Sequence, residues 1–563
     1  MVVGGCREWQ RKGRRTARAA RAWVGAMEQD VAHGRMTDQR SLADKAVTLG
    51  KGTLASRVLG FVRDASIAAL LGGGWVADAL LVAFRLPNIA RTLLAEGAFA
   101  YTLVPVYGSL RVLDPQRALG FGRTMATTLF VLFCLIALAG ALFSDHIALV
   151  LAPGFHTMPD VLEMASELMV LCLFSLPLVS GAAVSAAILM AEGHFKVPAY
   201  SSMVFNAVII LAAGLAFVFY SAGDSRIPYL LCYGAIVAGI TQWGYQAAGL
   251  RRAGVSLSGP VAFGDPAVRQ SLRTLPQSVF GVGGYHINIL LATFLASFLA
   301  EGTISSLYFA ERLIGFPLGV IGASIGLAAL SDLSAMAAPL RATSGEKSAS
   351  VVAEETLFSE RLAKAGRIVL FFALPAAVGT ACLALPLTSA IFGHGAFDQN
   401  ALQQTSRVLL AYLVGLPALA FARPLLAGLA ALDDAGSVMR GAFAGFAATG
   451  AFGLVLLVTG IPWGPALAVS LAAWTSAAVL TRALIRRGHN PLPGPVWAGK
   501  SLVASLVMGA CVLWAAGMVS SSFGKVALVP LGVAVYLVTT FALHLEESSF
   551  VFHTALRILQ KIR

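Results

Sequence analysis

Apolar runs of about twenty residues recur along this chain of 563 residues, and they limit what it can fold into. A soluble core cannot absorb such runs repeatedly, whereas a bilayer with a hydrocarbon core of about 30 Å requires helices of that length. The chain is 57% hydrophobic and only 12% charged, whereas soluble domains carry about 25% charged residues. The sequence therefore predicts an all-α polytopic membrane protein.

The pattern predicts about fourteen transmembrane helices after a basic tail at residues 1–45. This tail lacks the apolar core of a secretory signal, so we interpret it as a disordered cytoplasmic arm, unless translation begins at Met27 or Met36. The expected parts are an N-lobe at 46–250 with spans 1–6, a cytoplasmic linker at 251–274, a C-lobe at 275–490 with spans 7–12, and residues 491–563 with spans 13–14 and the C-terminal tail. The expected spans are 49–71, 76–108, 122–151, 163–191, 198–220, 228–249, 275–299, 303–333, 365–392, 402–430, 437–459, 462–485, 496–519 and 525–545.

Loop charge predicts the orientation of these spans. With the N-terminus inside, the inner loops carry most of the lysines and arginines, whereas the outer loops hold little beyond Arg226 and Lys525. This asymmetry follows the positive-inside rule and places both termini in the cytoplasm. It also accounts for the net charge of +13 without a nucleic-acid partner. Typical inner-loop arginines are Arg117, Arg123, Arg251, Arg252, Arg440, Arg482, Arg486 and Arg487.

Arginines also lie inside the expected spans. A charge near the bilayer centre costs about 2.5–3.5 kcal/mol on insertion scales, so it normally faces a wet cavity or a partner. The carboxylates in the same segments are fewer than the arginines, which leaves a positive surplus and indicates an anionic cargo. The arginines are Arg57, Arg63, Arg85, Arg91, Arg312 and Arg423, and the carboxylates are Asp64, Asp78, Glu96 and Glu311.

The sequence contains hints of an internal repeat. The stretch DALLVAFRL at 78–86 aligns without gaps to SSLYFAERL at 305–313, and the alignment pairs Arg85 with Arg312. A separation of 227 residues suits two six-helix halves related by pseudo-symmetry, a common plan in transporters.

Other chemistry finds no support in the sequence. The six cysteines are scattered singly, without the spacing of a zinc site or a disulfide framework, so we expect no metal. No GxxxxGK[ST] motif for ATP is present, and we expect no cofactor and no enzymatic activity.

Several stretches resemble one family closely. They are SRVLGFVRD at 56–64, ADALLVAFRLPNIARTLLAEGAFAYTLVPVY at 77–107, LAPGF at 151–155, FKVPAY at 195–200, YFAERLIGFPLGVIG at 308–322 and LTSAIFGHGAF at 387–397. On these segments the chain resembles the MurJ/MviN family of lipid II flippases, within the multidrug/oligosaccharidyl-lipid/polysaccharide (MOP) exporter superfamily. The resemblance covers about residues 46–545.

The resemblance implies a fold and a function. The fold is a V-shaped bundle in which two pseudo-symmetric six-helix lobes flank a central cavity, and the last two helices form a groove for a lipid tail. The cargo is lipid II, the undecaprenyl-pyrophosphate-linked disaccharide-pentapeptide precursor of peptidoglycan. It moves by alternating access across the bacterial cytoplasmic (inner) membrane, with the cell-wall synthesis machinery as a partner.

The resemblance also implies a site. Arg63, Asp64 and Arg312 match the family's cluster that holds the pyrophosphate. Arg57 and Arg91 match further cavity arginines, and Asp78 and Glu96 match acidic cavity positions. Because a carboxylate cannot bind phosphate without a cation, Asp64 is expected to orient Arg63 or Arg312, or to pair with one of them when the cavity is empty. Arg85 precedes Pro87, so it is either a further substrate contact or a side chain that bonds carbonyls freed at a proline kink.

Three other functions are weighed against this one. A flippase for another polyprenyl-pyrophosphate oligosaccharide would need the same arginines. An ion-coupled antiporter of the same superfamily would need membrane carboxylates rather than an arginine excess. An enzyme acting on polyprenyl phosphates would need a motif such as DDxxD, and Asp433-Asp434 lacks the third acid. Sodium coupling is not expected, because the later spans carry no well-placed carboxylates.

Overall fold

The computed structural model describes residue 52 and residues 54–93, 99–342 and 349–548, and all regular elements in these ranges are helices. The basic tail expected at 1–45 lies outside the described residues. A first helix covers residues 54–71. The others are α2 Trp75–Leu93, α3 Phe99–Leu113, α4 Pro115–Leu142, α5 Ser144–Leu151, a 3-10 helix η2 Pro153–Thr157, α6 Pro159–Leu173, α7 Ser175–Ala191, α8 Lys196–Phe219, α9 Ile227–Arg252, α10 Pro266–Ala296, α11 Thr303–Ala342, α12 Ala349–Cys382, α13 Ala384–Phe392, α14 Gln399–Leu413, α15 Leu416–Ala431, α16 Ala435–Leu457, α17 Gly464–Arg486, α18 Pro495–Gly517, α19 Ser522–Val526 and α20 Val529–Ala542.

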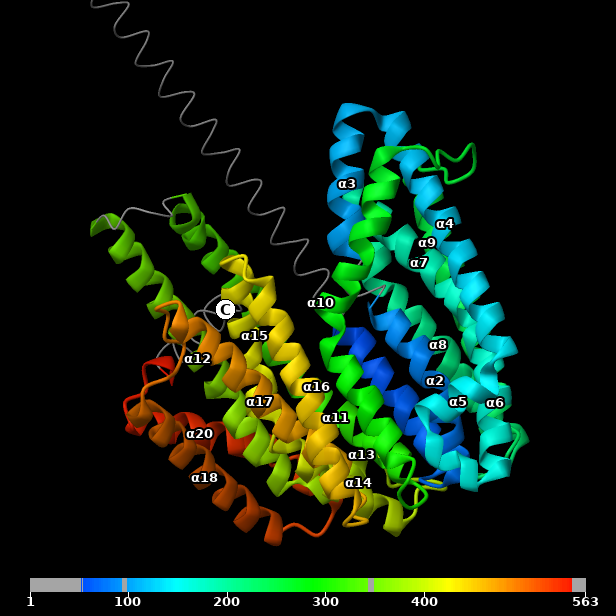
Figure 1. The fold of residues 1–563 in the computed structure, drawn as a ribbon. Coiled ribbons are helices and arrows are strands. Elements are labelled where there is room, and N and C mark those ends of the chain that lie inside the picture. Colours follow the sequence, from blue (N-terminus) through cyan, green and yellow to red (C-terminus); the bar gives the residue numbers. More distant parts are fainter. Residues whose placement is uncertain (1–51, 53, 94–98, 343–348, 549–563) are drawn as a thin grey trace, which may run out of the picture.

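The helices form two bundles that lie side by side (Figure 1). We call the helix at 54–71 together with α2–α9 the N-lobe, and α10–α17 the C-lobe. Helix α10 contacts α2 and α3 of the N-lobe as well as α16 and α17, so it lies between the lobes. Helices α18 and α20 pack on each other and on α12, at the outer edge of the C-lobe. The boundaries expected at 250, 274 and 490 stay a prediction.

Length and composition identify the membrane-crossing helices. Eight helices in the described part of the chain are long and apolar enough to cross a bilayer, or nine if the bent pair α14 and α15 counts as one span. Large apolar side chains such as Leu142, Val218 and Trp514 are exposed on these helices, which suits contact with lipid. A helix satisfies all its backbone hydrogen bonds internally, which is what a spanning segment requires. The count of fourteen spans stays a prediction.

Several expected spans are interrupted rather than continuous. The run at 122–151 breaks at Phe143, and Asp145 lies in the first turn of α5, where a carboxylate interacts favourably with the helix dipole. The run at 402–430 bends by 40° between α14 and α15. Pro417 lies in the first turn of α15, where its missing N–H leaves no helical hydrogen bond unmade. Apolar periodicity alone does not reveal such breaks, because both sides of each break are equally apolar.

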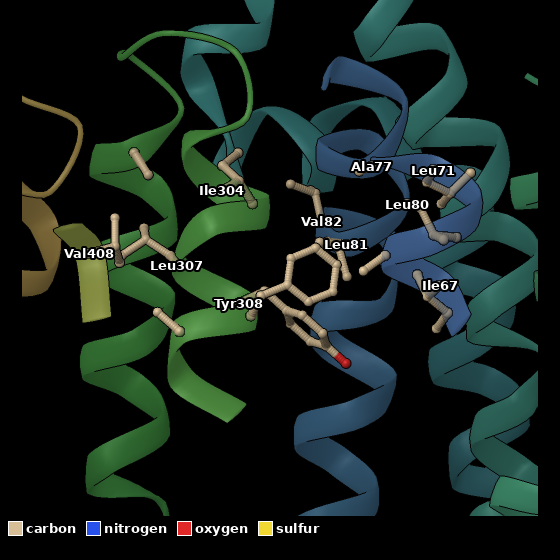
Figure 2. Close-up of a cluster of buried hydrophobic side chains, with 14 of the residues drawn as sticks. Ile67, Leu71, Ala77, Leu80, Leu81, Val82, Ile304, Leu307, Tyr308 and Val408 are labelled. Atoms are coloured by element: carbon tan, nitrogen blue, oxygen red, sulfur yellow. The ribbon is translucent and has the colours of Figure 1, made fainter. Parts of the chain in front are cut away.

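The lobes meet through an apolar cluster near one end. Leu80, Leu81 and Val82 of α2 belong to the same buried cluster as Leu307 and Tyr308 of α11 (Figure 2). These residues lie in the two segments of the internal repeat, so the aligned segments pack against each other where the lobes meet. The two segments of the repeat therefore form the two sides of this apolar contact between the lobes.

Glycines let the two backbones touch at that end, the lower one in Figure 1. The N–H of Gly154 donates to Ser297 Oγ at 3.0 Å, and a Cβ on Gly154 would lie 1.8 Å from the Ser297 carbonyl oxygen. Gly302 adopts a positive φ of 80°, and a Cβ there would lie 2.0 Å from the carbonyl oxygen of Gly73. No side chain fits at either position without separating the lobes. We call this region the closed end.

At the other end, the chain between α9 and α10 packs on α4. Asp265 accepts the N–H of Ala267 at the start of α10 and receives two hydrogen bonds from Arg117 of α4, at 2.8 and 3.0 Å. The hydrogen bonds from Arg117 hold the pKa of Asp265 below its ordinary value, although partial burial opposes them. The pair therefore stays ionised at neutral pH and fixes the start of α10 against the N-lobe.

Candidate functional site

Two arginines from opposite lobes share one buried carboxylate. Arg63 and Asp64 lie on the helix at 54–71, and Arg312 lies on α11. The Nη2 of Arg63 is 2.7 Å from Asp64 Oδ1, and its Nε donates to the same oxygen at 2.9 Å. The Nε of Arg312 is 3.3 Å from Asp64 Oδ2. Asp64 thus bridges the lobes, and it is only 2% exposed.

Two further side chains hold this cluster in place. Asn206 of α8 accepts a hydrogen bond from Arg63 Nη1 at 3.0 Å and donates to the carbonyl of Ser56 at 3.1 Å. Tyr308, one turn before Arg312 on α11, donates to Asp64 Oδ1 at 3.2 Å and accepts from Arg312 Nη2 at 3.2 Å. The Arg312 guanidinium also lies over the Tyr308 ring, 4.6 Å from its centroid. The orientation of both guanidinium groups is therefore fixed before any ligand binds.

Arg312 keeps more capacity for a ligand than Arg63 does. Its side chain is 27% exposed, whereas that of Arg63 is 9% exposed. Among the described residues it makes a single hydrogen bond, to Tyr308, and its Nε lies near Asp64 without a hydrogen bond of good geometry. A guanidinium has five N–H donors arranged as a fork that fits phosphate oxygens. Arg312 can therefore accept an anion without first breaking the cluster.

Arg57, on the helix at 54–71, contacts α11 about one turn after Arg312. Its Nη1 donates to the Gly315 carbonyl at 3.3 Å, and a Cβ on Gly319 would lie 2.2 Å from that same nitrogen. Arg57 is partly exposed. Gly319, seven residues after Arg312, thus leaves room for a third guanidinium, and Gly315 accepts its hydrogen bond.

Arg91, near the end of α2, is also partly exposed. Its guanidinium donates to the Asn88 side chain at 3.2 Å and lies over the Phe205 ring at 5.6 Å. Phe205 precedes Asn206 on α8, so Arg91 and Arg63 approach the same turn of that helix. The structure therefore places Arg57 against α11, and it places Arg63 and Arg91 against neighbouring residues of α8. Glu96 lies outside the described residues.

Arg85 forms a second link between the lobes. It is 4% exposed, pairs with Glu311 of α11 at 3.1 Å, and donates twice to Thr293 Oγ1 of α10 at 2.9 and 3.1 Å. Its guanidinium lies 5.9 Å from the centroid of the Tyr308 ring, and Arg312 also contacts that ring. The described partners of Arg85 are side chains of the other lobe rather than carbonyls freed at the proline kink, and the expected substrate contact stays a prediction.

Asp78 serves the start of α11. Its carboxylate accepts the backbone N–H of Gly302 at 2.8 Å and of Ser305 at 2.7 Å, and it is 4% exposed. The first N–H groups of a helix lack partners within the helix, so a carboxylate from another element can cap them. Asp78 thus joins α2 to α11 at the closed end, about two helical turns away from Arg85.

Sequence reasoning did not single out four of these residues. Asn206, Thr293 and Tyr308 gave no signal as isolated polar residues in apolar helices. Glu311 is among the carboxylates expected inside the spans, but the sequence assigns no binding role to it. The one available clue was the spacing of Tyr308 and Arg312, because residues four apart share a helix face. No group of three or more histidine, cysteine or acidic residues that could hold a metal occurs in the described part of the chain.

Comparisons with known proteins point to one family. The family model described as "Lipid II flippase MurJ" matches residues 67–534. A probable lipid II flippase MurJ from Vibrio cholerae is 29% identical over 533 residues, covering 89% of this chain and 96% of the relative. Another, from Rhizobium tropici, is 30% identical over 484 residues, covering 84% of this chain and 87% of the relative.

Solved structures agree on the fold. A structure of "Lipid II flippase MurJ, inward closed conformation" superposes with a TM-score of 0.73 at 21% identity, covering 88% of this chain and 99% of the other. An inward-facing multidrug resistance MATE family transporter of the MOP superfamily superposes with a TM-score of 0.59 at 15% identity, covering 77% of this chain and 94% of the other. The expected all-α architecture and the expected family are both confirmed.

Proposed function

The chain belongs to the MurJ family, and on that premise we propose that it flips lipid II from the cytoplasmic to the periplasmic leaflet of the bacterial cytoplasmic membrane by alternating access. The observation that carries this proposal is the sharing of Asp64 by Arg63 and Arg312, because it places two oriented guanidinium groups from opposite lobes at one point. An anion bound there contacts both lobes at once. Its binding can therefore be coupled to their relative movement.

We propose that Arg63 and Arg312 bind the pyrophosphate of lipid II, with Arg57 and Arg91 as further contacts. Arginine suits this task because its guanidinium stays charged in a dry site and binds phosphate oxygens with two parallel hydrogen bonds. Asp64 is the partner of the arginines when no substrate is bound. The pyrophosphate then takes the N–H donors that Asp64 leaves free, and Asp64 remains to hold Arg63 in position.

For Asp78 and Arg85 we propose a role beside the substrate rather than against it. Their described partners are groups of α10 and α11. These contacts hold the lobes together at the closed end, and they must separate when that end opens. Glu96 is proposed, on the family resemblance alone, to face the cavity.

The carboxylates in the site argue against an ion-coupled antiporter. Such a transporter needs membrane carboxylates that can take up and release a proton or a cation. Here Asp64, Asp78 and Glu311 are each engaged by arginines or by backbone N–H groups. A flippase for a different polyprenyl-pyrophosphate oligosaccharide would use the same arginines, so the substrate's sugar and peptide are assigned through the family.

We further propose that both termini face the cytoplasm, as the loop charges predict, and that α18 and α20 offer the lipid tail an apolar surface. The expected partners besides lipid II are membrane lipids and the enzymes of cell-wall synthesis that make or consume lipid II. None of these proposals requires a metal or a cofactor.

Depletion of the protein in its host tests the function. If the chain is the flippase, lipid II accumulates in the inner leaflet, and a reagent that acts only in the periplasm modifies less of it. Expression of the intact chain restores the modification. Normal periplasmic exposure of lipid II after depletion, with lipid II synthesis intact and no second flippase present, would contradict the proposal.

A further inference from the structure

A second basic site lies on the C-lobe, and none of the arginines of the transport site lines it. A cavity of about 420 Å³ opens between the start of α16 and the end of α17. Its size falls within the range of small-ligand sites, about 300–1,000 Å³. The lining residues are Asp434, Ser437, Arg440, Val479, Arg482, Ala483, Arg486 and Arg487.

The charges around this cavity do not balance. Four arginines face a single carboxylate, Asp434, so the lining carries a net charge of +3 (four minus one). Asp434 is already engaged: it accepts the N–H of Ser437 at 2.9 Å, the hydroxyl of Ser437 at 2.5 Å, and Arg487 Nη2 at 2.9 Å. Burial acts to raise the pKa of Asp434, but the bonds from Ser437 and the nearby arginines outweigh it and lower the pKa, so the group is ionised.

Arg482 and Arg486 remain available for a ligand, whereas Arg440 and Arg487 already have partners. Arg440 donates to the Ser437 hydroxyl at 2.7 Å. Arg482 and Arg486 are exposed, and neither has a hydrogen bond or an ion pair within the described residues. They are four residues apart on α17 and therefore lie on the same face. The N-terminus of α16 adds the positive end of its helix dipole. The cavity thus attracts an anion with two unused guanidinium groups.

The surroundings indicate where the anion comes from. Val479 and Ala483 add an apolar surface to the cavity. Met439 and Phe443 of α16 and Ile485 of α17 are exposed beside it, 60%, 66% and 46% respectively. Exposed apolar side chains of this size on membrane helices contact lipid. A cavity with both charged and apolar lining at the ends of two membrane helices suits a lipid headgroup.

We propose that this cavity binds the phosphodiester of an anionic phospholipid from the adjacent leaflet, with Arg482 and Arg486 as its principal contacts. A free phosphate could offer the same oxygens to the guanidinium groups. The lipid is favoured because the cavity combines those groups with an apolar surface and borders the lipid-facing side chains. The site is independent of the transport cycle, so its existence does not rest on the proposed function.

Binding of short-chain lipids to the purified full chain tests the proposal. The probes are dioctanoyl phosphatidylglycerol, dioctanoyl phosphatidylcholine and inorganic phosphate, titrated into protein in a neutral detergent and followed by native mass spectrometry. Phosphatidylglycerol should bind saturably, and phosphatidylcholine should not. The variant Arg482→Ala/Arg486→Ala should weaken phosphatidylglycerol binding by about tenfold or more, because it removes both charge-assisted contacts.

The matched control is Arg251→Ala/Arg252→Ala, which removes two exposed arginines from the end of α9 and changes the net charge equally. It should bind phosphatidylglycerol like the unaltered protein. An equal loss in both variants, or no loss in the first, would overturn the site. Inorganic phosphate that competes as strongly as the lipid would overturn the assignment to a lipid.

A measurement on the unaltered protein guards against a variant that does not fold. Phosphatidylglycerol with a photoreactive group near its headgroup should label the segment 479–487. Labelling confined to other segments would contradict the proposal.

Discussion

At the scale of single residues, one carboxylate organises the site. Asp64 is nearly inaccessible, yet it compensates two arginines that come from opposite lobes. Arg63 and Asp64 are adjacent in the sequence, so they are close to each other in any fold. The approach of Arg312 and Tyr308 does need the fold, because 244 residues separate Tyr308 from Asp64.

The first prediction concerns the two arginines that share Asp64. Arg63→Ala and Arg312→Ala should each abolish complementation of a flippase-depleted strain while the protein remains in the membrane. A charged hydrogen bond contributes about 1.5–3 kcal/mol, and each variant loses a bidentate pair. Lysine at either position should restore function only in part, because it keeps the charge but not the fork. Arg226→Ala, at an exposed ion pair with Asp224, serves as the control and should complement fully.

The second prediction concerns Asp64 itself. Asp64→Asn keeps the shape of the side chain but leaves two arginines without their shared carboxylate. Removing one partner of a buried ion pair typically costs about 3–5 kcal/mol, so the variant should unfold at a lower temperature. Inorganic pyrophosphate should recover more stability in this variant than it adds to the unaltered protein.

Thermal unfolding with and without pyrophosphate measures both effects. Asp224→Asn, at the exposed pair, should show neither the loss nor the recovery. A stable Asp64→Asn variant that ignores pyrophosphate would mean that Asp64 does not hold the anion site.

At the scale of elements, the interruptions of the helices and the close contact of their ends decide how the lobes fit. Apolar runs were sufficient to predict an all-helical membrane protein, whereas the count of fourteen spans stays a prediction. They were insufficient to predict the break at Phe143 or the bend between α14 and α15, because hydrophobicity does not change there. The capping of α11 by Asp78 was likewise beyond the sequence, since 224 residues separate Asp78 from Gly302.

The third prediction uses the closed end. Gly154→Ala places a methyl group 1.8 Å from the carbonyl oxygen of Ser297, a backbone atom that cannot yield easily. The variant should therefore populate the state in which this end is open. A cysteine at Val82, which is fully buried in the cluster between the lobes, should then react faster with a membrane-impermeant thiol reagent.

The control for this prediction is Gly244→Ala, which adds the same methyl group to α9 where no atom lies within 4 Å. It should leave the reactivity of the cysteine unchanged. Equal reactivity in the two glycine variants would show that the contact between Gly154 and Ser297 does not limit opening.

At the scale of the whole molecule, the arrangement has a positive site at the junction of two lobes. The sequence predicted the class and the family, because those depend on composition and on local motifs, whereas its assignment of the arginines to the substrate stays a prediction. It did not predict that Arg85 and Asp78 would bind the opposite lobe, since a local motif carries no information about a distant partner. The internal repeat at 78–86 and 305–313 was the nearest hint, and the structure places those two segments together.

The fourth prediction concerns the driving force. Arg57, Arg63, Arg91 and Arg312 give the empty site a positive charge that Asp64 offsets only in part. Moving one elementary charge through the membrane is worth about 2.3 kcal/mol per 100 mV, so a negative-inside potential favours the inward-facing state of the empty carrier. Bound pyrophosphate neutralises the site and removes this bias.

Collapse of the potential in vesicles, at constant pH and constant sodium, should therefore trap the protein with its periplasmic side open. The accessibility of the cysteine at Val82 reports this state. A response to a sodium or proton gradient alone would mean that the carrier is reset by ion coupling instead.

The most direct test of the central claim is transport of lipid II by the purified protein in liposomes. Fluorescent lipid II is incorporated into both leaflets, and a membrane-impermeant quencher added outside removes the signal of the outer leaflet. If the shared arginines carry the pyrophosphate, the intact chain makes almost all lipid II accessible under a membrane potential, whereas liposomes with Arg63→Ala or Arg312→Ala retain the protected half. Equal quenching by the intact chain and both variants, above that of protein-free liposomes, would contradict the account.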